Sequence, residues 1–226
     1  MRNSFSQLFK VKTSRNESVH MDKCCCHFFL LFEYLWVFQM LKQLRVISRK
    51  VLVLYEELKS IHDALGVRCN GCRLCCQTAA YNIEATMLEF IPLALHLIEN
   101  GEFDKWFEKA QRAVPTDRCV LLVDESTKIE GGCSFYDYRP LVCRLFSASY
   151  VRRRNIEVLS CQFLKRELSK KMDRLVDAQK YFDCLYDIDP YLAVQKRDIN
   201  TAFKQALEYV GMKFLLNTPP SLPFAS

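Results

Sequence analysis

Four cysteines stand within eight positions of the sequence, in the segment RCNGCRLCCQ at residues 68–77. They form two successive C-x2-C steps and end in an adjacent pair: Cys69, Cys72, Cys75 and Cys76. A C-x2-C step places two sulfur atoms at a tight turn where both can face one centre, as in zinc and iron–sulfur sites. Gly71 gives this turn its backbone freedom. The spacing indicates metal chelation by thiolates.

The adjacent pair at the end of this segment does not suit one small site. Side chains of neighbouring residues diverge in regular backbone conformations, so we expect Cys75 and Cys76 to serve different centres, or one of them to bind no metal. We further expect at least one of the pair to contribute to a centre whose coordination is incomplete or labile.

Four more cysteines follow at long intervals and would complete the ligand set: Cys119, Cys133, Cys143 and Cys161. The rigid bend at Arg139 and Pro140 can return the chain to the first cluster. Eight thiols exceed the four that one zinc ion needs. They could form two closed sites, one closed site with spare thiols, or one iron–sulfur cluster with four thiols left over. Eight buried structural thiols would be the alternative, which the repeated C-x2-C spacing disfavours.

Arginines stand beside several of these cysteines. Four of them are direct sequence neighbours of a cysteine of the set: Arg68, Arg73, Arg118 and Arg144. A centre with four thiolates carries surplus negative charge, which nearby guanidinium groups would offset while donating hydrogen bonds to sulfur. The pattern therefore favours ionised thiolates over neutral thiols.

Two segments together, CNGCRLCCQ and GGCSFYDYRPLVCRLF, resemble the CxxCxxCC family of YkgJ-like cysteine-cluster proteins, which is associated with zinc or iron chelation. The four clustered cysteines match its first motif. Its second motif is matched by Cys133, Phe135, Tyr136, Arg139, Pro140, Cys143 and Arg144. The resemblance also includes Cys119, Cys161 and a glutamate of the following helix, Glu84 or Glu89. It covers residues 69–161 and implies that these eight cysteines bind zinc or iron.

The resemblance implies metal binding without naming a reaction. Related domains occur in flagellin lysine methylase-like proteins, so an iron–sulfur enzyme or electron carrier, related to protein lysine methylation, is one alternative. A second is a zinc-stabilised adaptor that contacts protein or nucleic acid through VRRRN at 151–155, although we expect this run to be a solvated turn. The sequence contains no P-loop, H-E-x-x-H, G-x-S-x-G or glycine-rich methyl-donor loop, so it identifies no substrate and no protein or nucleic-acid partner.

Composition places the chain among ordinary globular proteins. It has 226 residues, of which 50% are hydrophobic and 26% charged, with a net charge of +6. Its 12 cysteines are about 5% of the chain, below the roughly 8–10% of disulfide scaffolds. No secretory signal is recognisable at the N-terminus. We therefore expect reduced thiols in a cytoplasmic protein.

Hydrophobic periodicity predicts helices on both sides of the cysteine motifs. The first three are expected at 40–65, ended by Gly66; at 83–100, kinked or broken by Pro92; and at 102–114, ended by Pro115. Two β-prone runs predict a hairpin within 119–140, and residues 156–164 a further short strand or turn. The last two helices are expected at 164–186 and 190–210, the second from Pro190 to Gly211. His62 and His96 lie on helical patterns and are expected to have surface or core roles.

We therefore predict a mainly α protein with a small irregular β-hairpin and a cysteine-rich metal-binding core between helices. The predicted divisions are an N-terminal extension at 1–39, the metal-binding domain at 40–165, a helical region packing on it at 166–212, and a disordered tail at 213–226. The apolar run at 24–38 is shorter than the roughly 20 residues that span a bilayer. It could be a helix packed on the body, a membrane-surface anchor, or sequence upstream of a true start at Met40.

Overall fold

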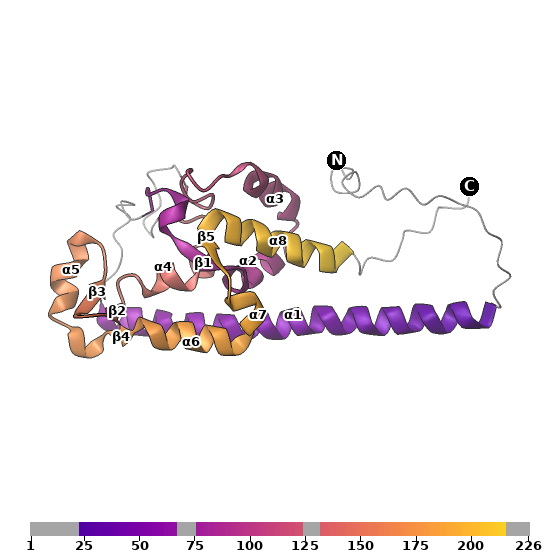
Figure 1. Cartoon of the computed structure of the whole chain (residues 1–226), viewed down its shortest axis with the longest axis horizontal. Helices are drawn as coiled ribbons and strands as arrows, with labels where there is room; N and C mark the ends of the chain where they lie inside the picture. The colour runs from indigo at the N-terminus through magenta and orange to yellow at the C-terminus, as the bar shows by residue number, and fades with distance from the viewer. Residues whose placement is uncertain (1–22, 67–75, 124–131, 216–226) are drawn as a thin grey trace.

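The structure, a computed structural model, describes residues 23–66, 76–123 and 132–215. Within these ranges eight α-helices account for most of the chain, which confirms the predicted mainly α fold (Figure 1). They are α1 (Lys23–Leu65), α2 (Met87–Glu99), α3 (Phe103–Arg112), α4 (Leu141–Leu145), α5 (Gln162–Ser169), α6 (Ala178–Ile188), α7 (Pro190–Ala193) and α8 (Ile199–Leu215).

Short strands connect the helices in two small sheets. In the first, β1 (Glu84–Thr86) pairs antiparallel with β5 (Lys196–Asp198). In the second, β2 (Ser149–Arg152) lies between β3 (Ile156–Leu159), which is antiparallel to it, and β4 (Val176–Asp177), which is parallel to it. Three 3-10 turns complete the described elements: η1 (Ala80–Asn82), η2 (Tyr136–Tyr138) and η3 (Met172–Arg174).

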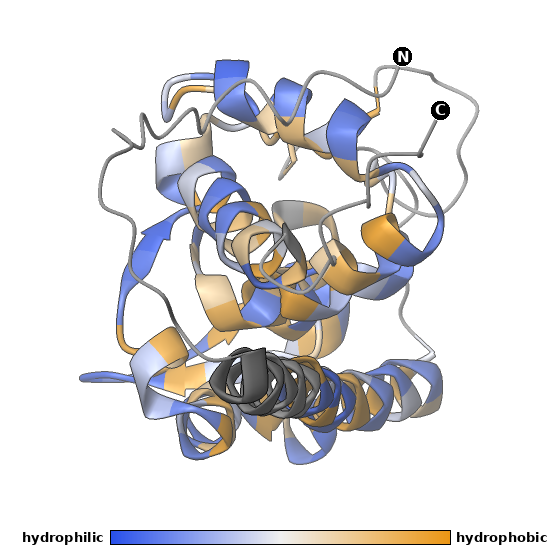
Figure 2. Ribbon diagram, turned by 90° about the vertical axis from the view of Figure 1, so that its right-hand side faces the viewer, coloured by the Kyte–Doolittle hydropathy of each residue, from blue (hydrophilic) through white to orange (hydrophobic). Residues whose placement is uncertain are grey.

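Helix α2 forms the centre of the hydrophobic core. Nine of its 13 residues are buried, as expected for a helix that is apolar on almost every face. It packs between α1 and α8, where the rings of Phe90 and Phe203 lie 5.4 Å apart, and Figure 2 shows the hydrophobic positions gathered toward the middle of the molecule. The helix continues through Pro92, so the predicted break there is wrong. Packing on both sides offsets the backbone hydrogen bond that proline cannot make.

Helix α1 ends at Gly66 as predicted, with a φ of 62° that glycine adopts without strain. It begins at Lys23 and so includes the apolar run 24–38 in one continuous helix. Its N-terminal half extends beyond the other elements (Figure 1). Among the described residues, no helix has both the length and the apolar character needed to cross a bilayer.

A chain shortened to residues 40–226 is expected to fold and to bind metal as the full chain does. The physical reason is that buried residues recur at helical spacing from Leu44 to Leu58, so this part of α1 packs on the body. Thermal melting followed by circular dichroism, with metal analysis of both chains, would test this. Insolubility of the shortened chain, or loss of its metal, would show that residues 1–39 belong to the core.

The helix predicted over 164–186 is wrong, because the chain is interrupted between α5 and α6. Residues Val176–Asp177 pair with β2 as strand β4. The Asp177 carboxylate then accepts a hydrogen bond from the Gln179 backbone N–H at 3.1 Å and caps α6. Pairing with a strand distant in sequence has overridden the local helical pattern.

The helix predicted over 190–210 is also two helices, separated by β5. Pro190 does begin α7, and the Asp189 carboxylate caps it by accepting from the Leu192 N–H at 3.1 Å. Helix α8 runs through Gly211 to Leu215, so the predicted end is wrong. Gly211 is buried, and packing around it stabilises the helix at a position that local propensity disfavours.

Candidate metal centre

Five of the eight candidate cysteines lie in the part of the chain that the structure describes. They are partly buried free thiols: Cys76, Cys119, Cys133, Cys143 and Cys161. The other three candidates, Cys69, Cys72 and Cys75, lie outside the described residues.

A short hairpin brings Cys119 and Cys133 close together. Leu122 and Cys133 form an antiparallel bridge, and the Val123 N–H donates to the Gly132 carbonyl at 2.7 Å. The base of the predicted hairpin is therefore present, while its loop at 124–131 lies outside the described residues.

Tight turns after these two cysteines direct backbone N–H groups at sulfur. The Cys119 thiol accepts from the N–H groups of Leu121 and Leu122, and the Cys133 thiol from that of Phe135. The first turn is closed by the Leu122 N–H, which also donates to the Cys119 carbonyl at 2.9 Å. Hydrogen bonds of this kind stabilise a thiolate, so each turn is suited to present a metal ligand.

Cys143 and Cys76 reach the same region from other elements. Cys143 lies on α4, directly after the Arg139-Pro140 bend. The segment that follows Cys76 is held beside the segment that precedes Cys119, because the Ala80 N–H donates to the Asp117 carbonyl at 2.7 Å. The ionised forms of the four thiols act on one another electrostatically. Four elements thus contribute to one group of thiols, called here the thiol group: Cys76, Cys119, Cys133 and Cys143.

The thiol group is unfavourable for free negative charge. Burial raises the pKa of Cys119 to about 12 and also raises the pKa values of Cys133 and Cys143, and repulsion from neighbouring thiols adds to the increase. Without a cation, these thiols therefore stay protonated at neutral pH. A coordinating metal ion reverses this preference, because a bound thiol is deprotonated outright.

Cys161 is the candidate whose described contacts are limited to its own helix start. It is the N-cap residue of α5, and the described contacts do not join it to the thiol group. Within residues 23–66, 76–123 and 132–215, no three His, Cys, Asp or Glu side chains are arranged to hold a metal ion.

Two arginines of the second motif face the thiol group. Arg144 is only 5% exposed. Its guanidinium group donates hydrogen bonds to the carbonyls of Arg139 (2.9 Å) and Asp137. The same group lies 4.1 Å from the centre of the Tyr55 ring. In the described part of the chain it forms no ion pair with a carboxylate. The positive charges of Arg139 and Arg144 oppose the effect of burial on the pKa of Cys133. Of the two, Arg139 has the larger effect on Cys133.

Glu89 positions the helix that carries Cys143. One carboxylate oxygen accepts from the Leu141 N–H at 2.8 Å, and the other accepts from the N–H (2.5 Å) and hydroxyl (2.9 Å) of Thr86. The start of α4 is therefore tied to the start of α2. Burial raises the pKa of Glu89, and both of its oxygens are already used. Glu84, the other glutamate considered, is exposed on β1.

The two histidines on helical patterns have supporting contacts. His62 Nε2 donates to the Arg144 carbonyl at 2.5 Å, and burial lowers the pKa of this imidazole and so favours its neutral form. His96 stacks on Tyr138 with ring centres 4.5 Å apart. Sequence analysis did not reveal that His62 holds the backbone of the motif arginine.

Asn200, at the start of α8, is a further residue that sequence analysis missed. Its side-chain oxygen accepts from the Val120 N–H at 2.8 Å, and its side-chain nitrogen donates to the carbonyls of Val114 (3.3 Å) and Arg118 (3.1 Å). This amide is 1% exposed. It fixes the segment that contains Cys119 from a helix 80 residues further along the chain.

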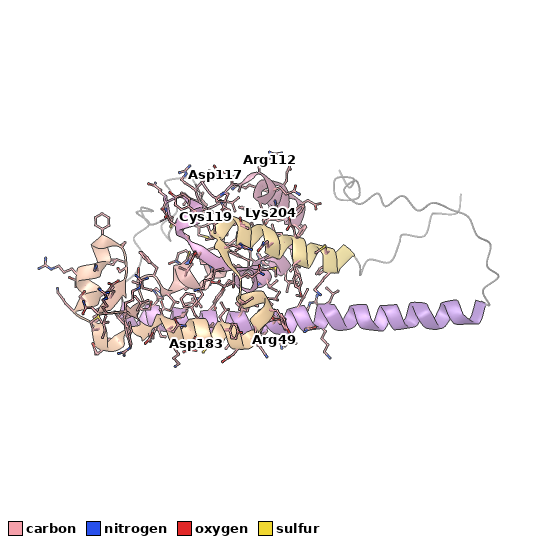
Figure 3. The ribbon with its side chains drawn as sticks, in the orientation of Figure 1. Arg49, Arg112, Asp117, Cys119, Asp183 and Lys204 are labelled. Atoms are coloured by element: carbon pink, nitrogen blue, oxygen red, sulfur yellow. The ribbon has the colours of Figure 1, made fainter. Side chains whose placement is uncertain are left out.

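A cavity of about 300 Å³ borders Cys119. Its lining includes Lys109, Asp117 and Leu122, and Figure 3 shows Cys119 and Asp117 on the side of the molecule where α3 and α8 lie. The thiol group therefore has a cavity beside one of its members, Cys119.

Fold and site together define a mainly helical protein in which distant elements direct thiols and guanidinium groups to one region. Comparison with protein families agrees with this class. Residues 68–172 match the CxxCxxCC family, described as "Putative zinc- or iron-chelating domain", which confirms the resemblance seen in the sequence. Residues 68–172, a little under half of the chain, are therefore similar to this family. Comparison with curated proteins and with solved structures gave no match.

Proposed function

We propose that this protein binds zinc or iron at the thiol group, and that the bound ion ties together the elements that supply its ligands. The proposal is supported by the electrostatic influence that Cys76, Cys119, Cys133 and Cys143, on four separate segments, have on one another. The spacing of Cys69, Cys72 and Cys75 makes them further candidate ligands. Cys161 remains the eighth candidate ligand.

The charge around the thiol group supports ionised ligands. A divalent ion with four thiolates carries a net charge of about −2. Arg144 is a buried cation without a carboxylate partner among the described residues, and an isolated buried charge costs several kcal/mol unless an opposite charge lies close by. Together with Arg139, it would balance a tetrathiolate centre. A reducing compartment such as the cytoplasm suits this site, since disulfide formation would remove ligands.

The solvent cavity beside Cys119 bears on the kind of centre. A structural zinc site is closed by four protein ligands, whereas a reactive or exchanging site keeps an accessible position. The cavity of about 300 Å³ borders the residue Cys119. It supports the expectation of a labile centre with an accessible position beside Cys119.

Metal analysis of protein purified without oxygen, combined with visible absorption, tests the proposal. Zinc in a colourless sample would identify a zinc-chelating domain. Charge-transfer bands in a brown sample, with inorganic sulfide, would identify an iron–sulfur protein and favour the enzyme or electron-carrier alternative. Protein that contains no metal, and that binds neither ion after reduction of its thiols, would refute the proposal.

Zinc binding to the metal-free protein at pH 7 is expected to release close to one proton for each thiol that binds. The reason is that the pKa values of Cys119, Cys133 and Cys143 are raised above their ordinary value, so these thiols are protonated before they coordinate the ion. Calorimetry in two buffers of different ionisation enthalpy gives the number of protons released. Binding without proton release would mean that these thiols are not ligands.

The same pKa shifts predict the response of the metal-free protein to alkali. A raised pKa favours the folded state while the thiol is protonated. For Cys119 this contribution is complete below the ordinary pKa of 9.0 and is lost as the pH rises toward about 12. The metal-free protein should therefore lose stability above pH 9, and the metal-bound protein much less. Melting temperatures of the metal-free and the metal-bound protein, measured at pH 8 and at pH 10, test this expectation.

A further inference from the structure

Almost all of the net positive charge of this protein lies in one short part of the chain. Residues 149–180 contain nine Lys or Arg and four Asp or Glu, a net charge of +5, while the whole chain has +6. These residues form β2, β3, α5, η3 and β4, which lie together at one end of the molecule (Figure 1). We call residues 149–180 the basic end. Its interior is a small hydrophobic cluster, separate from the main core: Leu65, Ala148, Leu168 and Leu175.

Most of the cations of the basic end are not neutralised within it. Arg152 pairs with Asp177, and Lys170 pairs with Glu167. Besides Lys180 at the start of α6, five exposed cations of the basic end have no ion-pair partner in the part of the chain that the structure describes: Arg153, Arg154, Lys165, Arg166 and Arg174. They are contributed by the β2–β3 turn, by α5 and by η3. Such a set attracts anionic ligands.

The arginines of the turn stand on an ordered ribbon. Strands β2 and β3 pair through four residues each, and the Arg153 N–H donates to the Asn155 carbonyl at 3.1 Å to close the turn. Arg152 is held between the Asp177 carboxylate and the Tyr150 hydroxyl, both at 3.0 Å. Arg153 and Arg154 are therefore presented from a fixed base, which lowers the entropic cost of binding.

We propose that the basic end binds the phosphate backbone of nucleic acid, without preference for sequence. Guanidinium groups match phosphate in geometry, and a two-stranded ribbon is narrow enough to enter a groove of a duplex. Phe163, 55% exposed on the first turn of α5 among these cations, provides a surface on which an unpaired base can stack. This inference is independent of the metal-binding function.

The test is fluorescence anisotropy of labelled single-stranded RNA and duplex DNA, titrated with the full metal-loaded chain between 50 and 200 mM KCl. Five cations on phosphate give an expected slope of log K against log salt of about −4 for duplex DNA. The variant Arg153→Glu/Arg154→Glu should weaken binding at least about tenfold and make the slope shallower by about 2. Phe163→Ala should weaken binding of the single strand several-fold and leave duplex binding nearly unchanged.

The matched control is Lys42→Glu/Lys50→Glu, which makes the same change in net charge at exposed positions of α1 outside the basic end. This variant should bind nucleic acid within about twofold of the unaltered chain. Both double variants should have the same melting temperature as the unaltered chain. Equal weakening by the two double variants would show a general charge effect and overturn the proposal. So would absence of nucleic-acid binding at 50 mM KCl, or tighter binding to phosphatidylserine vesicles than to either nucleic acid.

Discussion

Replacing Cys133 or Cys143 with serine is expected to release the metal and to lower the melting temperature by about 10 °C or more. Metal-binding free energy in thiolate sites acts as folding free energy, of the order of 10 kcal/mol for a full ligand set. A serine hydroxyl stays protonated and is a poor ligand for zinc, so most of this stabilisation would be lost. Even a loss of about 4 kcal/mol shifts the melting temperature of a domain of this size by about 10 °C. Metal content and thermal melting measure both effects.

Cys184→Ser is the matched control for this pair. Cys184 is a partly buried free thiol on α6, and it lies outside both cysteine motifs. Its replacement should leave the metal content unchanged and cost no more than about 1 kcal/mol. Metal loss at Cys184 equal to that at Cys133 would mean that the thiol group is not the centre. Loss of stability without loss of metal at Cys133 would mean that this thiol serves packing.

The cysteine motifs could be predicted because their chemistry is encoded locally. A C-x2-C step, or a cysteine followed by a tight turn, specifies where sulfur points within a few residues, and no distant contact is needed. The charges of Arg139 and Arg144 both act on Cys133, that of Arg139 more strongly, although Arg139 has no cysteine neighbour in the sequence. The sequence also indicated that Cys119, Cys133 and Cys143 return to one region.

The errors in the fold arise where distant pairing competes with helical periodicity. Between residues 164 and 186, the pairing of β4 with β2 interrupts a pattern that is helical by every local criterion. The pairing of β5 with β1 does the same before α8. At Pro92 and Gly211 the opposite occurs, since packing holds a helix together across residues that usually end one. In each case the deciding free energy comes from residues far away in sequence.

The supporting residues could not be recognised in the sequence for the same reason. Glu89 reads as an ordinary capping-box glutamate after Thr86, and it is one. Its second oxygen binds the Leu141 N–H, 52 residues away, and this contact is what positions the helix of Cys143. Asn200 gives no sequence signal beyond a polar side chain in the first turn of a helix. Its importance lies in the three backbone groups that it meets after folding.

Asn200→Ala is expected to lower the free energy of unfolding by about 2–4 kcal/mol, or roughly 5–12 °C in melting temperature. The change leaves the Val120 N–H and the carbonyls of Val114 and Arg118 without their buried partner. Because these groups lie directly beside Cys119, the thiol would be held less firmly, and a chelator should remove the metal several-fold faster. Thermal melting and the rate of zinc transfer to a coloured chelator measure the two effects.

Two further variants show whether these effects come from the hydrogen bonds of Asn200. Asn200→Asp keeps an acceptor for the Val120 N–H but loses both donated bonds, so it places a carboxylate oxygen against two carbonyls and should be at least as unstable as Asn200→Ala. Thr201→Ala alters the neighbouring, half-buried side chain and should change the stability and the rate of metal transfer little.

Residues 68–172 match the family, whereas Asn200 lies outside this range. If Asn200→Ala melts and releases metal as Thr201→Ala does, α8 is not needed to hold Cys119; if it loses both stability and metal, the metal-binding unit extends to α8.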